Sequence, residues 1–178
     1  MDINIIEKLS VDQTVLLLIS GTEYNDITLN LAKQLSGKKV AYVTLNKTCI
    51  ALRDHFKKEG VGVENFVFID GITKTIKNVP DMSDGCYYVS SPNALTEISI
   101  TISKLLKHGF DYLVFDSLTN LLIYQEKAPV ARFVSNAVAK IKSENGKALF
   151  YALSGGKQEA LIQEAGMFVD RVVDLSKG

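Results

Sequence analysis

The sequence predicts an α/β fold, a three-layer αβα sandwich with a mainly parallel central sheet. Short apolar runs alternate with longer segments that carry the 3.6-residue period of helices. The short runs are apolar at consecutive positions, as expected of strands buried on both faces. Such alternation requires a parallel sheet covered by helices on both sides. At 178 residues, the chain is long enough to form this core as a single domain over residues 1–178.

Seven segments are predicted to be strands. The first carries the apolar run Val15 to Ile19 between polar ends. The others are short and apolar in the same way, and the full set is 14–20, 39–45, 65–70, 86–90, 111–116, 147–153 and 168–175.

Five helices are predicted between these strands. Glycine ends three of them, and the fourth has the clearest apolar stripe at i, i+3, i+4 and i+7 spacing. The set is 26–36 before Gly37, 48–59 before Gly60, a helix from near Pro92 to His108 and Gly109, a helix containing 130–141, and 158–165. The remaining long connection, residues 71–85, is polar and is predicted to be irregular.

Charge and apolar content indicate an ordinary soluble protein. Twenty basic residues balance twenty acidic ones, so no overall field attracts nucleic acid or an anionic membrane, and we expect neither as a partner. The N-terminal MDINIIEKLSVDQ has no basic region followed by an apolar run, which argues against a signal peptide. The run 15–19 is too short to span a bilayer. We therefore expect a cytoplasmic protein.

The cysteines and histidines carry no metal-site pattern. Cys49 and Cys86 lie far apart and form no CxxC pair, so we expect buried thiols in a reducing compartment and no disulfide. His55 and His108 have no neighbours at ligand spacing. No metal site is predicted.

The turn after the first strand is the first candidate site, because ligands of α/β sheets bind beyond the carboxyl ends of the strands. It reads GTEYNDIT from Gly21 to Thr28. The phosphate-binding pattern GxxxxGK[ST] is met at Gly21 and Thr28, but Asp26 replaces its second glycine and Ile27 its lysine. One charge pair at 4 Å is worth roughly 4 kcal/mol in a partly screened site, so ATP binding should be weakened by orders of magnitude. We expect Asn25 or Asp26 to cap the helix instead.

The segment DYLVFDSLTNLL supplies the second candidate site. A hydrophobic strand ending in Asp116 and followed by Ser117 is typical of a Walker B motif, whose carboxylate orders magnesium. The alternative is that Asp116 or Ser117 caps the next helix.

The chain resembles the archaeal KaiC-like branch of the RecA superfamily of P-loop ATPases. The similar stretches run through most of the sequence: VLLLISG, GKKVAYVTLN, CYYVSSPNALTEISITISKLL, FDYLVFDSLTNLLIY and MFVDRVVDL. The resemblance implies a RecA-like P-loop NTPase fold, side-by-side assembly with ATP at subunit boundaries, and an association with signalling. It also implies an acidic residue after the second strand that activates water. This sequence has Asn46 and Lys47 there.

Three losses therefore agree: the loop glycine, the loop lysine and the catalytic acid. They favour a non-catalytic pseudo-ATPase that acts as a regulatory or protein-interaction module, with a protein partner or further copies of itself. We expect no catalytic residue and no bound cofactor, ATP with magnesium being the remaining candidate ligand.

Two alternatives stay open. One is a divergent ATPase in which Thr28 and Asp116 hold magnesium and Lys47 supplies the missing cation. The other is a DNA accessory protein, which the neutral charge balance does not support.

The candidate ligand-binding residues come from both motifs and from one further loop. Leu153-Ser-Gly-Gly-Lys157 is similar to the signature of ABC cassettes but follows Asp116 instead of preceding a Walker B strand, so we interpret it as a glycine turn. The resemblance to RecA-like proteins places a nucleotide-sensing residue in this loop. The full set is Gly21, Thr22, Asn25, Thr28, Asp116, Ser117 and Ser154.

Overall fold

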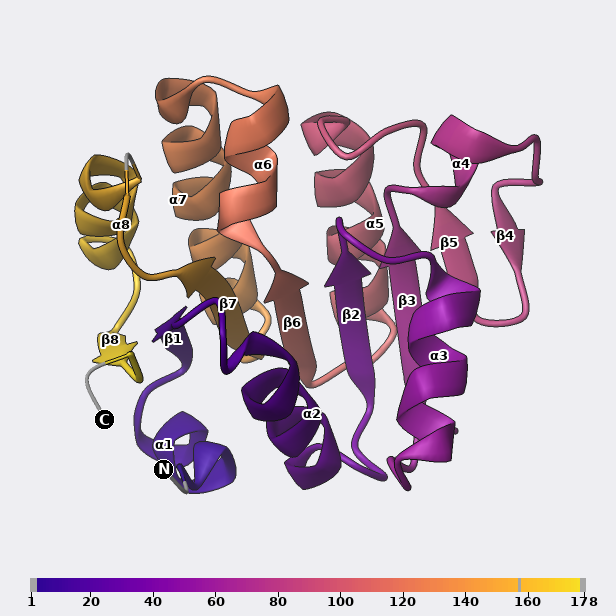
Figure 1. Ribbon diagram of the computed structural model, residues 1–178, viewed down its shortest axis with the longest axis horizontal. Helices are drawn as coiled ribbons and strands as arrows, with labels where there is room; N and C mark the ends of the chain where they lie inside the picture. The colour runs from indigo at the N-terminus through magenta and orange to yellow at the C-terminus, as the bar shows by residue number, and fades with distance from the viewer. Residues whose placement is uncertain (1–2, 157, 177–178) are drawn as a thin grey trace.

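The computed structural model describes residues 3–156 and 158–176. Within this part of the chain, eight strands form one sheet with helices on both faces (Figure 1). The strands are β1 (Thr14–Ile19), β2 (Val40–Thr44), β3 (Phe66–Asp70), β4 (Met82–Ser83), β5 (Cys86–Tyr88), β6 (Tyr112–Asp116), β7 (Lys147–Leu153) and β8 (Arg171–Asp174). The helices are α1 (Ile5–Val11), α2 (Tyr24–Gln34), α3 (Cys49–Lys58), α4 (Thr73–Ile76), α5 (Leu95–Lys107), α6 (Leu118–Tyr124), α7 (Lys127–Ser143) and α8 (Glu159–Gly166).

The strand order is β4-β5-β3-β2-β6-β7-β1-β8. All neighbouring pairs are parallel except β4 and β5. Strand β1 precedes the candidate phosphate loop, and strand β6 ends in Asp116. Strand β7 lies between these two strands. Because the strands are parallel, their carboxyl ends lie on the same side of the sheet. The start of α2, the turn after β2 and the start of α6 therefore lie close together there.

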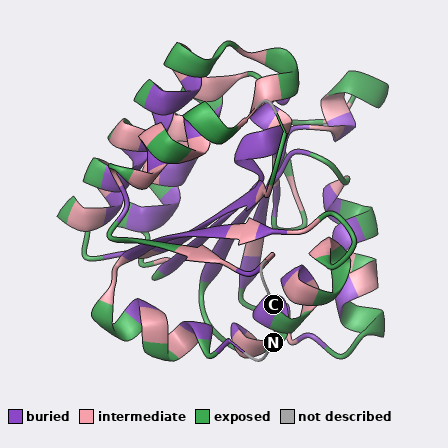
Figure 2. Ribbon diagram, turned by 60° about the vertical axis from the view of Figure 1, so that its left-hand side comes forward, coloured by how far each residue is buried: buried purple, intermediate pink, exposed green. Residues whose placement is uncertain are grey.

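Each face of the sheet has its own core, and alternate residues of the strands point into each. Helices α1, α2 and α3 cover one face, where the strands present Leu17, Tyr42, Val114 and Tyr151. Helices α5, α6, α7 and α8 cover the other face (Figure 2). The predicted three-layer αβα architecture is therefore confirmed. None of the helices in the described part of the chain has the length and apolarity needed to cross a membrane.

The irregular connection predicted for 71–85 is wrong in part, because α4 and β4 lie within it. Asp70 at the end of β3 nucleates α4 by accepting hydrogen bonds from the Ile72 and Thr73 N–H groups at 2.7 and 2.8 Å. An ion pair between Lys74 and Asp81 then joins α4 to the start of β4.

The prediction of two separate buried thiols is also wrong. Cys49 and Cys86 are buried as expected, but they form a disulfide with their Cα atoms 6.3 Å apart. Cys49 begins α3, and its N–H donates to the Asp70 carboxylate at 2.7 Å. Since β5 lies beside β3, this anchor brings Cys49 to Cys86. The separation of 37 positions in sequence hides that proximity.

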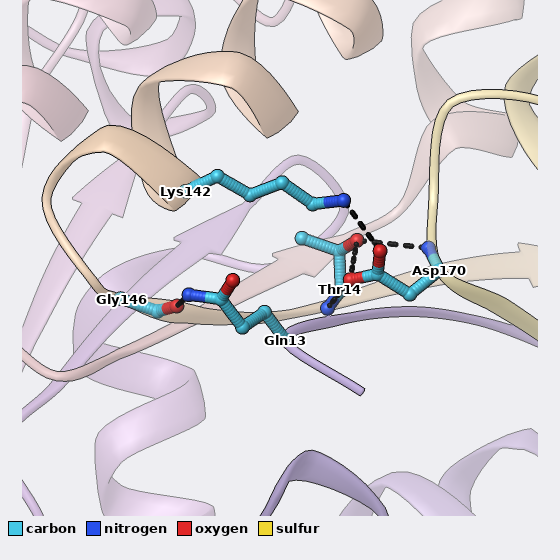
Figure 3. A network of polar contacts seen from close by, with 5 residues as sticks. All are labelled: Gln13, Thr14, Lys142, Gly146 and Asp170. Carbon is cyan, nitrogen blue, oxygen red and sulfur yellow. Dashed lines mark hydrogen bonds and ion pairs between the residues drawn. The ribbon is translucent and has the colours of Figure 1, made fainter. Parts of the chain in front are cut away.

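A polar network connects the amino-terminal ends of β1 and β8, on the side of the sheet away from the candidate site (Figure 3). The Asp170 carboxylate accepts hydrogen bonds from the N–H and the hydroxyl of Thr14, both at 2.9 Å. Asp170 also forms an ion pair with Lys142 near the end of α7. Gln13 donates to the Gly146 carbonyl at 3.2 Å. The network therefore links the start of β1, the residue before β8 and the end of α7.

Candidate functional site

The turn after β1 is shorter than a phosphate-binding loop. The predicted helix start at residue 26 is wrong, since α2 begins at Tyr24 with Glu23 as its N-cap residue. The Ile27 N–H donates to the Glu23 carbonyl at 2.9 Å, so it is used within the helix. Gly21 precedes the helix in open space, where a Cβ would meet no atom within 4 Å. The first turn of α2 thus occupies the chain positions that the pattern assigns to the loop.

Capping of α2 by Asn25 or Asp26 is also wrong. Both residues lie inside the helix, and no side chain makes a capping hydrogen bond at Glu23. Asn25 instead receives a long hydrogen bond from the Lys47 ammonium, 3.4 Å from its Oδ1. Asp26 remains in the first turn, where its negative charge still favours the positive end of the helix dipole. The helix thus tolerates these residues without using them as caps.

The Thr28 hydroxyl faces its own helix. It donates to the Tyr24 carbonyl at 2.8 Å and lies 3.2 Å from the Asn25 carbonyl. Its side chain is buried against α2, a common back-bonded arrangement for threonine inside helices. Thr22, the other hydroxyl of this segment, lies 3.2 Å from the Ser20 hydroxyl. Neither hydroxyl lines the cavity described below.

Asp116 lies at the end of β6 and is 3% exposed. Its Oδ2 accepts a hydrogen bond from the Tyr42 phenol at 2.9 Å. Its Oδ1 accepts one from the Tyr24 phenol and one from the Asn46 amide, the latter at 3.2 Å. Three neutral donors therefore surround the carboxylate. Burial raises the pKa of Asp116 to about 7, because the charged form is poorly solvated there.

Tyr151 completes the aromatic surroundings of Asp116. The β6–β7 ladder pairs Phe115 with Phe150, so Asp116 and Tyr151 follow in the same register. The Tyr151 hydroxyl is buried and has no hydrogen-bond partner among the described residues. Burial raises the pKa of Tyr151, and Tyr42 and Asp116 raise it further. Tyr42 and Tyr151 thus flank Asp116 on the face covered by α2.

Ser117 caps α6. Its hydroxyl accepts a hydrogen bond from the Asn120 N–H at 3.3 Å and also donates to the Asn120 side chain. The Asp116–Ser117 peptide bond is cis. Of the two capping candidates after β6, Ser117 therefore takes the role, and Asp116 points instead toward the tyrosines.

The space between these elements is a small cavity of about 250 Å³. Its lining is polar but carries no ionisable acid or base apart from a phenol: Gly21, Tyr24, Asn25, Asn46, Ser117, Asn120 and Leu153. Pockets that hold drug-sized ligands usually measure about 300–1,000 Å³. Among the predicted ligand-binding residues, Gly21, Asn25 and Ser117 meet at this cavity.

The other predicted residues do not line the cavity. Asp116 is covered by Tyr24, and Thr22 and Thr28 lie outside the lining. Ser154 follows β7, where its N–H donates to the Ile19 carbonyl at 2.9 Å. Gly155 follows Ser154 at a φ of 85°, as expected of the predicted glycine turn. Lys157 lies outside the described residues. No cluster of three or more metal-ligating side chains occurs within 3–156 and 158–176.

Sequence reasoning missed the tyrosines. Tyr42 and Tyr151 lie in strands that were predicted, and strand alternation places them on the same face as Asp116. That pattern could have identified both. Tyr24 could not be found in this way, because it reaches Asp116 from a helix 92 positions away.

Comparison with known proteins supports the fold. No protein-family model matches the chain, and no curated protein matches its sequence. Among solved structures, the chain is similar to a KaiC-like protein from the hyperthermophilic archaeon Pyrococcus horikoshii, with a TM-score of 0.65 and 15% sequence identity. The match covers 93% of this chain and 72% of that protein. The chain thus has a RecA-type fold of the KaiC-like kind.

Proposed function

We propose that this chain is a non-catalytic RecA-type module, a pseudo-ATPase that acts by binding a protein partner or further copies of itself. The observation that carries the proposal is the hydrogen bond from the Tyr24 phenol to Asp116. It places a side chain of the candidate phosphate loop on the carboxylate that a magnesium ion would need. The strands of the described residues form one eight-stranded sheet, which supports the proposal that the chain is one domain.

The phosphate side of the site differs from a phosphate-binding loop, because Ile27 stands at the position of the loop lysine. A phosphate loop presents several backbone N–H groups and a lysine to its ligand. Here helix α2 begins at Tyr24, and its Ile27 N–H is bonded within the helix. The Ile27 side chain packs against the apolar core of that face. The segment therefore contributes to packing in place of phosphate binding.

The two side chains expected to bind magnesium already have hydrogen-bond partners within the protein. Magnesium prefers ionised oxygen ligands with room for several waters. Asp116 is buried beneath three donors, and its raised pKa leaves it partly protonated at neutral pH. The Thr28 hydroxyl, the other expected magnesium ligand, is bonded to carbonyl groups of α2. Asn46 stands where an acid would activate water, and its amide donates to Asp116.

An ATP hydrolysis assay tests the proposal. We expect phosphate release by the wild-type chain with magnesium to equal the release by Asp116→Ala, because neither protein hydrolyses ATP. Hydrolysis by the wild type that is lost in Asp116→Ala would contradict the proposal. Asp111→Ala, at an exposed position that precedes the same strand, controls for a general effect on the preparation.

A second candidate function is a divergent ATP-binding protein. One observation favours it: the Lys47 ammonium lies 3.4 Å from Asn25 at the start of α2, close to where a loop lysine would act. If Lys47 supplied that cation, Lys47→Ala and Thr28→Ala would each weaken nucleotide binding. Lys38→Ala, a variant of an exposed lysine outside the cavity, is the matched control.

A further inference from the structure

A short turn runs from the end of β2 to the start of α3 and reaches the candidate site (Figure 1). Asn46 in this turn donates a hydrogen bond to the Asp116 carboxylate at 3.2 Å. The ammonium of the next residue, Lys47, lies 3.4 Å from the Asn25 side chain. The Lys47 N–H in turn donates to the Thr44 hydroxyl at 3.3 Å. The position of the turn therefore decides whether these two side chains stay beside the cavity.

The far end of the turn is held by the disulfide. Thr48 caps α3, and Cys49 is the first residue of the helix. Cys49 is bonded to Cys86 on β5, and both side chains are fully buried. The Cys49 N–H also donates to Asp70 at the end of β3. The disulfide thus ties the start of α3 covalently to β5, two strands away from β2.

A second contact joins the same two parts of the chain at the surface. Arg53 lies one helical turn beyond Cys49, and its guanidinium donates to the carbonyl of Asp84. Asp84 lies between β4 and β5, two positions before Cys86. Hydrogen bonds that are exposed to solvent belong to the parts of a protein that open most easily. The Arg53 contact is therefore expected to open before the buried disulfide is reached.

We propose that the disulfide between Cys49 and Cys86 is a redox switch that holds the turn between β2 and α3 at the candidate site. A dithiol that reaches the sulfurs breaks their bond by thiol–disulfide exchange. Two electrons and two protons pass to the protein, the two cysteines become thiols, and the dithiol is oxidised to a disulfide. Opening of the contact between Arg53 and Asp84 admits the dithiol.

Reduction moves the start of α3. Two thiols need more room than a disulfide, because their sulfurs are no longer bonded, and both cysteines lie in a close-packed core. Cys86 is fixed in β5, which pairs with β3 on one side and with β4 on the other. Cys49 follows a turn, so its end of the helix yields. The turn then holds Asn46 on Asp116 less firmly. This switch goes beyond the proposed loss of ATPase activity and does not depend on it, since it acts through contacts within the protein.

Native-state hydrogen exchange, followed by NMR on the full chain, tests the switch. We expect the Ala51 N–H, which the Thr48 cap holds at 3.3 Å, to exchange faster after reduction by the dithiol. The loss of about one hydrogen bond corresponds to an increase of roughly two- to tenfold. The matched control is the Glu7 N–H, which the Asn4 cap of α1 holds at 3.1 Å and which should not change. In Cys86→Ser, the dithiol should change neither rate.

The rate of reduction provides a second readout. We expect the dithiol to release thiols from Arg53→Ala faster than from the wild type, because the contact with Asp84 is absent. Lys57→Ala, a variant of an exposed lysine on the same helix, should react like the wild type.

Three results would overturn the proposal. The first is equal exchange of the Ala51 N–H in the oxidised and reduced wild type, with thiol titration confirming reduction. The second is an equal acceleration at Glu7, which would show general loss of stability. The third is a disulfide that the dithiol reduces only in the unfolded chain. An unchanged rate of reduction in Arg53→Ala would contradict the access step.

Discussion

The phenol of Tyr24 donates a hydrogen bond to the carboxylate of Asp116, although the two residues lie 92 positions apart. They belong to the segments that follow β1 and end β6, and β7 separates these strands. Two strand spacings amount to about 10 Å, a distance that a tyrosine projecting from the first turn of α2 helps to bridge. The contact couples the start of α2 to the end of β6.

Tyr24→Phe removes this hydrogen bond and keeps the ring. We expect it to lower the free energy of unfolding by about 1–3 kcal/mol, because a buried carboxylate loses one of its donors. Urea denaturation measures the change. Tyr124→Phe is the control, since Tyr124 is 49% exposed, and its effect should be near zero. Equal effects of the two variants would contradict the coupling of Tyr24 to Asp116.

Asp116 makes stability depend on pH. Its pKa rises from 3.8 to about 7 on folding because of burial, so the folded state binds more protons than the unfolded state between these values. The stability that comes from protonation of Asp116 in the folded state is thus fully present below about pH 4. It is lost as the pH rises through 7.

Asp116→Asn removes this titration and isolates it from other groups. From pH 4 to 8, we expect wild-type stability to fall relative to the variant, by on the order of 4 kcal/mol at most. Urea denaturation across this range gives the difference. Asp111→Asn, at an exposed position before β6, should follow the wild type. A constant difference between wild type and Asp116→Asn would show that Asp116 does not titrate in this window.

The disulfide between Cys49 and Cys86 should stabilise the fold. Their separation of 37 positions corresponds to about 3–4 kcal/mol from the restricted unfolded chain. Cys86→Ser should therefore unfold at a lower temperature than the wild type. Since both cysteines are buried, reductant should be present throughout equilibrium unfolding. It should lower the wild-type midpoint to near that of the variant and leave the variant unchanged. A wild type that does not respond to reductant would contradict this prediction.

Asp170 should stabilise the fold at the amino-terminal ends of β1 and β8. Burial alone would raise its pKa, but hydrogen bonds from Lys142 and Thr14 lower it below the usual value. Its contribution is therefore present above the unfolded pKa and is lost as the pH falls through the folded pKa. Asp170→Asn should cost about 1–2 kcal/mol at neutral pH. The difference from wild type should shrink in acid, as measured by urea denaturation. A difference that is independent of pH would contradict the role of the Asp170 charge.

The strands could be predicted from sequence because burial on both faces leaves consecutive apolar residues, as in β1 and β6. Helix α1 was missed because it has seven residues and buries only Ile5 and Leu9. The start of α2 was misplaced because the phosphate-loop pattern suggested an open turn there, whereas the segment from Tyr24 is helical. The contacts of Asp116 depend on the order of strands and on the reach of Tyr24. Neither is encoded in the local sequence pattern.

Calorimetric titration of the wild-type chain with ATP and with ADP, in the presence of magnesium, tests the loss of nucleotide binding most directly. We expect no heat of binding up to millimolar nucleotide. Asp116 accepts a hydrogen bond from Tyr24, the Thr28 hydroxyl is bonded within its own helix, and the cavity is small and neutral. Thr28→Ala should then be indistinguishable from the wild type. Micromolar binding that disappears in Thr28→Ala would contradict the account and show that the segment from Gly21 to Thr28 holds a nucleotide.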